Sequence, residues 1–222
     1  EGRVRGRVVE AGADHGARRE DGAPGRRRGN RDRRDAGGGD FYDRVYRAER
    51  PELFFKASAW RCSAPGEPIG RRHDSTFTAS EPELALVLGR RGTILGFTLA
   101  NDVSAWDIER ENPLYLPQSK IYRGCFSFGP VVVTPDEVGD PDDLGIRCLV
   151  NGEVRQESNT RHLIFDCYDA IEHLTKAFTL DPGDVLFMGT PAGVGAAMKP
   201  PCFLQEGDVV RVEIDKLGYI EN

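Results

Sequence analysis

Apolar residues along the chain fall mostly into short runs that are separated by Gly, Pro and Asn-Gly turns. Short apolar runs with turn-forming residues on both sides are typical of β-strands. One stretch, residues 163–178, instead repeats its apolar residues at helical spacing and predicts an α-helix. The pattern therefore predicts an α+β, mainly β domain with few short helices. The predicted strands are residues 53–56, 83–88, 93–101, 131–134, 146–150, 153–155, 185–188 and 209–214.

Three acidic residues lie at the ends of two strands that should pair as a hairpin. Glu81-Pro82-Glu83 opens the first strand, and Asp102 follows directly after the second. Residues i and i+2 of an extended chain point to the same face, and Pro82 favours the extended conformation because it cannot continue a helix. A turn at 90–92 would bring the end of the second strand back beside the start of the first. The pattern predicts that the three carboxylates lie side by side.

Neighbouring carboxylates at the start of a core strand cost free energy unless a cation compensates their charge. Ligands that are all oxygen atoms suit a hard divalent cation. The spacing and the hairpin together are equally compatible with two interpretations: a metal site, or acids on a solvated strand edge.

Residues 1–39 differ from the rest of the chain in composition, with 10 Gly, 11 Arg and almost no large apolar residues. Such a segment buries too little apolar surface to offset the entropy of ordering it. We therefore expect a disordered or atypical segment at 1–39 and a folded domain at 40–222. A basic arm for nucleic acid is the alternative, but no aromatic residues interleave with the arginines.

Charge and cysteine usage narrow the class of protein further. The formal net charge is −6, and the acidic excess lies in residues 40–222, which should repel nucleic acid and anionic membranes. No apolar run approaches the roughly 18 residues that would span a bilayer. The five cysteines show no CxxC spacing, which favours free thiols in a reducing compartment over disulfides or a zinc cluster. These features predict a soluble cytoplasmic protein with neither nucleic acid nor a membrane as partner.

Several motifs resemble those of the fumarylacetoacetate hydrolase superfamily, and they occur in the order in which its C-terminal catalytic domain carries them. The stretch around Glu81 and Glu83 resembles the first metal motif of that family, and the stretch around Asp102 resembles the second. Lys120 falls where the family places an active-site lysine. The resemblance covers roughly residues 40–222. Its motifs are EPELALVLG (81–89), NDVSAWDI (101–108), VNGEVRQ (150–156) and GTPAGVG (189–195).

The resemblance implies a mixed β-sandwich roll, a homodimer, and a Mg²⁺ or Mn²⁺ ion held by Glu81, Glu83 and Asp102. It also implies a small 2-oxo acid as substrate, whose oxo and carboxylate oxygens chelate the metal. The metal would act as a Lewis acid and stabilise the enolate formed in the reaction. With this family in view, the metal site becomes the favoured interpretation of the three carboxylates.

The resemblance also suggests catalytic and substrate-binding roles for residues outside the metal motifs. Lys120 would place positive charge beside the enolate, and Thr190 would present its hydroxyl and N–H to the substrate carboxylate from a Gly-rich turn. Glu52 is a candidate general acid or base because a carboxylate beside apolar aromatics should have a raised pKa, with a surface acid as the alternative. Substrate contacts are expected from Gln156, Arg155 and Gly189.

The resemblance leaves more than one reaction open. Residues 189–195 resemble the hydrolases, which predicts cleavage of a C–C bond in a 2,4-dioxo acid through a metal-bound enolate. Residues 109–122 instead resemble the dehydratases of 2-keto-3-deoxy sugar acids, in which Glu52 and Lys120 would act on the C3 proton and the leaving hydroxyl. Arg44 stands where many members carry a lid histidine, and a guanidinium is no base at neutral pH. We predict a hydrolase, with a dehydratase of a 2-keto-3-deoxy aldonic acid as the first alternative and an inactive metabolite-binding relative as the second.

Overall fold

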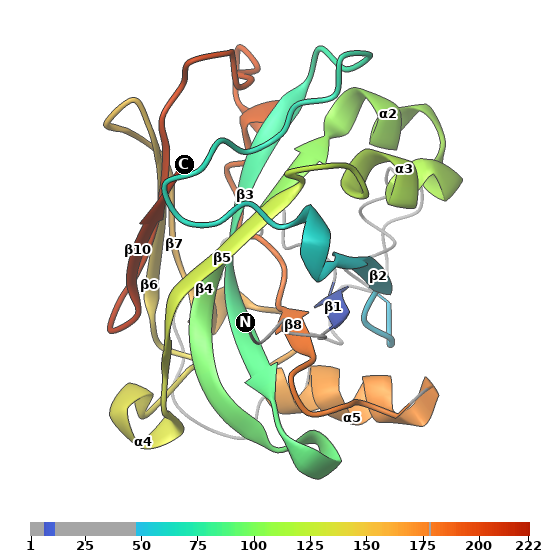
Figure 1. Cartoon of the computed structure of the whole chain (residues 1–222), viewed down its shortest axis with the longest axis vertical. Helices are drawn as coiled ribbons and strands as arrows, with labels where there is room; N and C mark the ends of the chain where they lie inside the picture. Colours follow the sequence, from blue (N-terminus) through green and yellow to red (C-terminus); the bar gives the residue numbers. More distant parts are fainter. Residues whose placement is uncertain (1–6, 12–47, 178) are drawn as a thin grey trace, which may run out of the picture.

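Two β-sheets form the core of the computed structural model, which describes residues 7–11, 48–177 and 179–222 (Figure 1). Neighbouring strands are antiparallel throughout, except that β1 runs parallel to β8. In spatial order, sheet A contains β2 (Leu53–Ser58), β1 (Arg7–Ala11), β8 (Val185–Phe187), β3 (Thr78–Leu88), β4 (Ile94–Ala105) and β5 (Phe126–Val133), and sheet B contains β10 (Gly218–Glu221), β9 (Val210–Ile214), β6 (Gly145–Val150) and β7 (Glu153–Asn159). The predicted α+β, mainly β class is confirmed.

The helices are short and lie around the sheets. Among them, α2 (Trp106–Glu111) and α3 (Leu116–Lys120) lie side by side, on the other side of β3 and β4 from sheet B (Figure 1). Two more helices, α4 (Pro135–Val138) and α5 (Cys167–Ala177), flank the end of the molecule that contains the β3–β4 turn. Single turns of 3₁₀-helix occur at Ala59–Arg61, Arg90–Gly92, Pro113–Tyr115, Thr160–His162 and Gly195–Ala197.

The helix predicted at 163–178 is shorter in the structure, where α5 begins only at Cys167. Asp166 explains this start, because its Oδ1 accepts hydrogen bonds from the backbone N–H groups of Tyr168 and Asp169, both at 2.8 Å. An Asp at this place satisfies N–H groups that have no partner inside the helix. The last residue of the predicted range lies outside the described residues.

The predicted hairpin is confirmed, and β3 and β4 are both longer than expected at the end that contains the acids. The register places Glu81 directly opposite Asp102. Pro82 occupies a central strand, where the missing N–H of proline usually disrupts pairing. It is tolerated here because β8 pairs with β3 only from Ala85 onwards.

The two faces of the β3–β4 hairpin differ in chemistry. One face packs against sheet B and contributes to the main hydrophobic core. Because side chains alternate along a strand, Glu81, Glu83 and Ala85 lie on the other face. The hairpin therefore separates an apolar layer from an acidic one. The core residues on the first face are Leu84, Leu86, Leu88, Phe97 and Leu99.

Strand β1 lies inside residues 1–39, the segment that differs in composition from the rest of the chain. Arg7–Ala11 form a strand between β2 and β8, although no structure was predicted there. Val8 accounts for this locally, because its side chain is 2% exposed and packs in a second apolar cluster with Ala57 and Phe187. Valine also suits a pleated, buried strand. The boundary at residue 40 stays a prediction.

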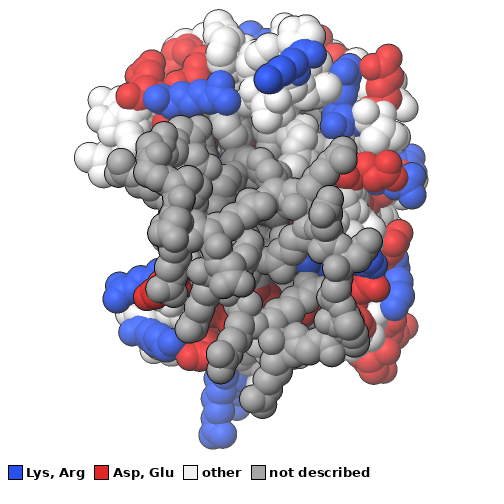
Figure 2. Space-filling view, turned by 180° about the vertical axis from the view of Figure 1, so that it is seen from behind, with Lys and Arg blue, Asp and Glu red and all other residues white. Residues whose placement is uncertain are grey.

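None of the helices within the described ranges is both long and apolar enough to cross a membrane. On the face shown in Figure 2, basic and acidic side chains are interspersed around the visible described surface. That part of the surface therefore shows no large field of one sign, which is the usual mark of a polyanion-binding face.

Candidate active site

The three predicted acids do converge. Glu81 and Asp102 face each other across the β3–β4 pair, and Glu83 lies two residues further along the same face of β3. One carboxylate oxygen of each lies within 4.8 Å of the others. All three side chains are at most 1% exposed. The structure thus excludes the interpretation of these acids as a solvated strand edge.

Lys120 lies in the middle of this acidic group. Its Nζ donates hydrogen bonds to Glu81 Oε2 at 2.9 Å, to Asp102 Oδ2 at 2.7 Å and to Ser104 Oγ at 2.8 Å. The side chain comes from the last residue of α3 and is buried. The lysine that the family motif singled out is therefore at the site, with its three donors directed at the β3–β4 hairpin.

A second lysine, Lys56, was missed by the sequence analysis. Its Nζ lies 2.5 Å from Asp102 Oδ1 and donates to the backbone oxygen of Lys120 at 2.5 Å. The side chain is fully buried on β2. A lysine inside the apolar run Leu53–Ser58 was the available signal, because a lysine is almost never fully buried unless it is paired.

The carboxylates also accept hydrogen bonds from two neutral donors. Trp106 Nε1 donates to Glu81 Oε1 at 2.7 Å, and the backbone N–H of Gly189 donates to Glu83 Oε2 at 2.6 Å. The other oxygen of this residue, Glu83 Oε1, is buried and has no hydrogen-bond partner among the described residues. A buried anionic oxygen without a partner is costly, and it marks the place where positive charge is lacking.

Burial disfavours the charged form of these acids. It is the largest cause that raises the pKa of Glu81 to about 7, a change that Lys120 opposes and Asp102 reinforces. Burial, followed by repulsion from Asp102 and Glu81, raises the pKa of Glu83 well above its usual range. Three acids and two ammonium groups leave one negative charge in excess. An additional cation with a preference for oxygen ligands fits this donor set.

Gln156 fixes the segment 189–191, which lies next to Glu83, by hydrogen bonds. Gln156 Nε2 donates to Thr190 Oγ1 at 3.2 Å and to the carbonyl of Pro191 at 2.9 Å, and both side chains are buried. Gly189, with φ of 89°, takes a conformation that favours glycine, and its N–H is directed at Glu83. Three of the predicted site residues therefore lie together: Gln156 bonds to Thr190, and the neighbouring Gly189 bonds to Glu83.

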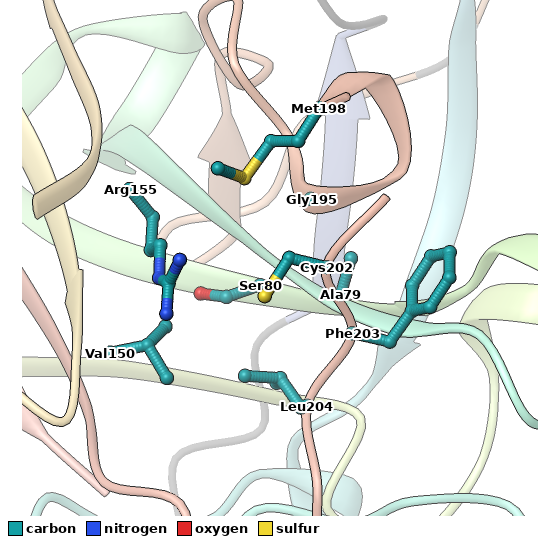
Figure 3. A pocket seen from close by; sticks show the side chains of 9 residues that line it. All are labelled: Ala79, Ser80, Val150, Arg155, Gly195, Met198, Cys202, Phe203 and Leu204. Atoms are coloured by element: carbon teal, nitrogen blue, oxygen red, sulfur yellow. The ribbon is translucent and has the colours of Figure 1, made fainter. Parts of the chain in front are cut away.

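Arg155 is placed elsewhere. It lines a small pocket with Ser80 and Met198, between sheet B and the 195–204 segment (Figure 3). Ser80 alternates with Glu81 and contacts Cys148 of sheet B, so this pocket lies on the opposite face of β3 from the acids. A role of Arg155 in binding substrate stays a prediction that this geometry does not support.

Glu52 and Glu109 form a second acidic pair beside the site. Glu52 directly precedes β2 and is half-buried; burial, and then the charge of Glu109, raise its pKa, while Lys120 opposes them. Glu109 lies on α2 and accepts a hydrogen bond from Ser119 Oγ at 3.2 Å. The sequence analysis proposed Glu52 but gave Glu109 no role. Arg44 lies outside the described residues.

The sequence matches the family model described as fumarylacetoacetate (FAA) hydrolase C-terminal over residues 39–222. It is 43% identical to a probable 2-keto-3-deoxyxylonate dehydratase of Haloferax volcanii and to a 2-dehydro-3-deoxy-D-arabinonate dehydratase of Saccharolobus solfataricus, each over 82% of this chain. It is 41% identical to a mitochondrial oxaloacetate tautomerase of Xenopus laevis over 77% of this chain. The chain spans 57–63% of the length of these relatives.

The fold agrees with these matches. A solved 2-keto-3-deoxy-D-arabinonate dehydratase, complexed with magnesium and 2,5-dioxopentanoate, superposes with a TM-score of 0.81 at 37% identity, covering 99% of this chain and 72% of that one. A fumarylacetoacetate hydrolase from Exiguobacterium antarcticum superposes with a TM-score of 0.74 at 29% identity, covering 99% of this chain and 75% of that one. The predicted β-sandwich roll is therefore confirmed, and the chain belongs to the fumarylacetoacetate hydrolase family, whose C-terminal domain it contains.

Proposed function

We propose that this chain is a magnesium-dependent dehydratase that removes water from a 2-keto-3-deoxy aldonic acid. The observation that carries the choice of reaction is the α2–α3 segment. This segment carries Lys120, which contacts Glu81, and Glu109, which contacts Ser119 next to Lys120. Residues 109–122 of the segment are also the part of the sequence that resembles the dehydratases. The two dehydratases that match at 43% identity support the same choice. They favour the dehydratase over our first prediction, the C–C hydrolase.

Glu81, Glu83 and Asp102 would hold the Mg²⁺ ion, and Mn²⁺ would fit the same oxygens. The uncompensated Glu83 Oε1 supports this assignment, and so does the magnesium complex of the similar dehydratase. When bound, the ion would polarise the 2-oxo group of the substrate and make its C3 protons more acidic.

Thr190 is suited to bind the substrate carboxylate. Its Oγ1 accepts a hydrogen bond from Gln156, which leaves the hydroxyl proton of Thr190 available for donation. Gln156 in turn is fixed by the carbonyl of Pro191. We therefore assign Thr190 to substrate binding and Gln156 to positioning the turn that carries it. Gly189 acts through its backbone, because its N–H orients Glu83.

Lys56 and Lys120 would keep Asp102 ionised. Both ammonium groups lie within 2.7 Å of an oxygen of Asp102, and a carboxylate next to a positive charge favours its ionised form. An ionised Asp102 is the form that binds a cation. We assign these lysines to the electrostatics of the site.

The test is an assay of the chain with the 2-keto-3-deoxy pentonates and hexonates in the presence of Mg²⁺. Dehydration of a pentonate gives an aldehyde, which is detected by coupling to an aldehyde dehydrogenase and following NADH. Dehydration of a hexonate gives a ketone at C5, which is detected by NMR. We expect turnover that EDTA abolishes and Mg²⁺ restores. Glu137→Gln, an exposed acid on α4, is the matched control for acid substitutions at the site and should retain full activity.

Two other outcomes would overturn the proposal. Cleavage of oxaloacetate or an acylpyruvate, with no dehydration of any sugar acid, would restore the hydrolase. No turnover of either class, together with no effect of Mg²⁺ on the melting temperature, would indicate the inactive metabolite-binding relative. The homodimer and the cytoplasmic location stay predictions.

A further inference from the structure

A small pocket lies on the face of β3 that is opposite to the acids, between sheet B and the 195–204 segment (Figure 3). The space inside its walls measures about 20 Å³, which is room for little more than one water-sized group. A ligand of this pocket must therefore be compact. The polar lining includes Arg155 and Ser80, and the apolar lining includes Val150, Met198, Phe203 and Leu204.

Arg155 brings a positive charge into this pocket that is only partly compensated. Figure 3 shows its guanidinium directed into the pocket, toward Ser80. Its Nε is buried and has no hydrogen-bond partner among the described residues, while its Nη2 lies 3.0 Å from Glu153 Oε2. The Glu153 side chain is 73% exposed, so solvent screens this ion pair and its contribution is small. A buried donor without a partner is costly in apolar surroundings, and the pocket therefore lacks negative charge at Arg155.

The shape of the guanidinium indicates which anion would fit. Nε and one Nη of an arginine form a fork that binds the two oxygens of a carboxylate. Arg72 uses this fork elsewhere in the chain, with Nε 2.8 Å from Asp74 Oδ1 and Nη2 2.6 Å from Asp74 Oδ2. Arg155 has the same two nitrogens, one without a partner and the other paired with an exposed acid. A compact monovalent anion, either a small carboxylate or a chloride ion, can complete the fork.

The pocket shares two walls with the candidate active site. Ser80 precedes Glu81 on β3, and Arg155 precedes Gln156 on β7. Because side chains alternate along a strand, the first residue of each pair faces the pocket and the second faces away from it. Asn101 connects the two sides of β3, since its Oδ1 accepts hydrogen bonds from Ser80 Oγ at 2.7 Å and from the backbone N–H of Glu81 at 3.2 Å. An anion in the pocket would therefore lie behind the acids.

We propose that this pocket is a second binding site, that it takes a compact monovalent anion at Arg155, and that the bound anion strengthens Mg²⁺ binding on the other face of β3. The anion would neutralise the charge of Arg155, which otherwise disfavours a second positive charge at the acids nearby. The anion site stands on the geometry of the pocket alone. Its effect on Mg²⁺ rests on the proposed function.

The line width of the chloride NMR signal tests the site in the metal-free protein, because chloride that exchanges with a protein site gives a broader line. We expect the wild-type protein to broaden the signal and acetate to reverse the broadening by competition. Sulfate, which is larger and divalent, should reverse it less. Reversal by acetate identifies a carboxylate as a ligand of the site, and broadening that only chloride causes identifies an inorganic anion.

Three variants assign the broadening to the pocket. Arg155→Gln should weaken chloride binding by more than about tenfold, because it removes charged hydrogen bonds. Glu153→Gln removes the exposed acid that competes for Nη2 and should tighten chloride binding by about threefold. Arg147→Gln, which changes an exposed arginine paired with Glu157 on the same sheet, is the matched control and should change nothing. Glu153 is an exposed side chain, so its variant keeps the test decisive even where Arg155→Gln does not fold.

The effect on the metal is measured in the same experiment. Coupling between two sites is reciprocal, so Mg²⁺ should tighten chloride binding by the factor by which chloride tightens Mg²⁺ binding. We expect a factor of about fivefold, at the lower end of typical couplings. The wild-type protein is titrated with chloride in the absence and presence of Mg²⁺. A thermal melt shows separately that Mg²⁺ binds.

Equal broadening by the wild type, Arg155→Gln and Glu153→Gln would overturn the anion site. Mg²⁺ that raises the melting temperature but leaves chloride affinity unchanged would overturn the coupling. Mg²⁺ that does not bind at all would contradict the proposed function, and the chloride titration of the metal-free protein would still decide whether the pocket binds an anion.

Discussion

The acidic side chains of the site form two groups that differ in burial and in the elements that carry them. Glu81, Glu83 and Asp102 lie on two long paired strands and are at most 1% exposed. Glu52 and Glu109 lie at a strand start and on a short helix, and both are half-buried. The first group is fixed by strand register, whereas the second depends on how α2 and α3 pack beside β2.

This difference matches two kinds of chemistry. Fully buried acids on a rigid hairpin hold a fixed geometry and are short of positive charge, which suits a bound cation. Half-buried acids exchange protons with solvent and can change their protonation state during turnover. Under the proposed function, acids in one site would divide between binding the cation and transferring protons according to their surroundings.

The largest effect should come from Lys56→Met, which leaves a buried Asp102 with one ammonium partner fewer. Removing one partner of a buried ion pair typically costs about 3–5 kcal/mol of unfolding free energy. Urea unfolding of the metal-free protein measures it. Lys176→Met breaks the exposed ion pair with Glu172 and should cost less than about 1 kcal/mol. Equal stabilities of the two variants would show that the buried pair does not form in solution.

Glu83→Gln should weaken Mg²⁺ binding by more than about 100-fold, because even the loss of an outer-shell partner costs 10–100-fold. The metal-free variant should melt no lower than the wild type, since the substitution removes a buried acid whose Oε1 lacks a hydrogen-bond partner among the described residues. Calorimetric titration with Mg²⁺ and a thermal melt test both points. Retained Mg²⁺ affinity would mean that the ion is held elsewhere.

Binding of Mg²⁺ should depend on pH. This dependence should come from the three buried acids, Glu81, Glu83 and Asp102, and not from Glu52 or Glu109. The cation and the proton compete for Glu81, whose pKa is raised to about 7 in the metal-free protein. Affinity should therefore fall as the pH is lowered through about 7, by about tenfold per pH unit for each proton displaced. Titration calorimetry in two buffers of different ionisation enthalpy counts the protons released. Affinity that does not change between about pH 8 and about pH 5.5, a range that includes that pKa, would contradict the burial of Glu81 in the metal-free protein.

The smallest effect is expected from Ser119→Ala, which removes the hydroxyl that donates to Glu109. One hydrogen bond contributes about 1 kcal/mol, so kcat/KM for dehydration should fall by about fivefold. Mg²⁺ affinity should stay the same, because the Ser119 hydroxyl donates to Glu109 and to the carbonyl of Leu116 and not to Glu81, Glu83 or Asp102. Ser158→Ala, which removes a half-buried hydroxyl of β7, is the control for loss of a hydroxyl. A fall in Mg²⁺ affinity would show that the two acidic groups are coupled.

The convergence of Glu81, Glu83 and Asp102 could be predicted because the sequence patterns that indicate it are local. Alternation along β3 sets Glu81 and Glu83 on one face, and the turn at 90–92 fixes which residue of β4 lies opposite. The same signals predicted most strands to within a few residues. They need no knowledge of the rest of the chain.

Lys56 and Glu109 could not be placed from the sequence because their positions depend on contacts between distant segments. Lys56 reaches Asp102 of β4 from β2, which is not a neighbour of β4 in sheet A and is placed by its pairing with β1 and by the contact of Lys56 with Lys120. Glu109 reaches Ser119 only through the sharp turn between α2 and α3, where the side chain of Asn112 accepts a hydrogen bond from the N–H of Leu114 at 2.9 Å. Helices this short have no periodicity that a sequence pattern could reveal.

Strand β1 has a consequence for the order in which the molecule can fold. It pairs with β2, which follows it by some forty residues, and with β8, where Val8 lies opposite Val185. Sheet A cannot be completed until β8 has left the ribosome, and contacts between such distant segments form slowly because their loop must close first. The β3–β4 hairpin, by contrast, needs only a short loop. Its acids would therefore be in register early, and Lys56 would reach them late, with the closing of the sheet.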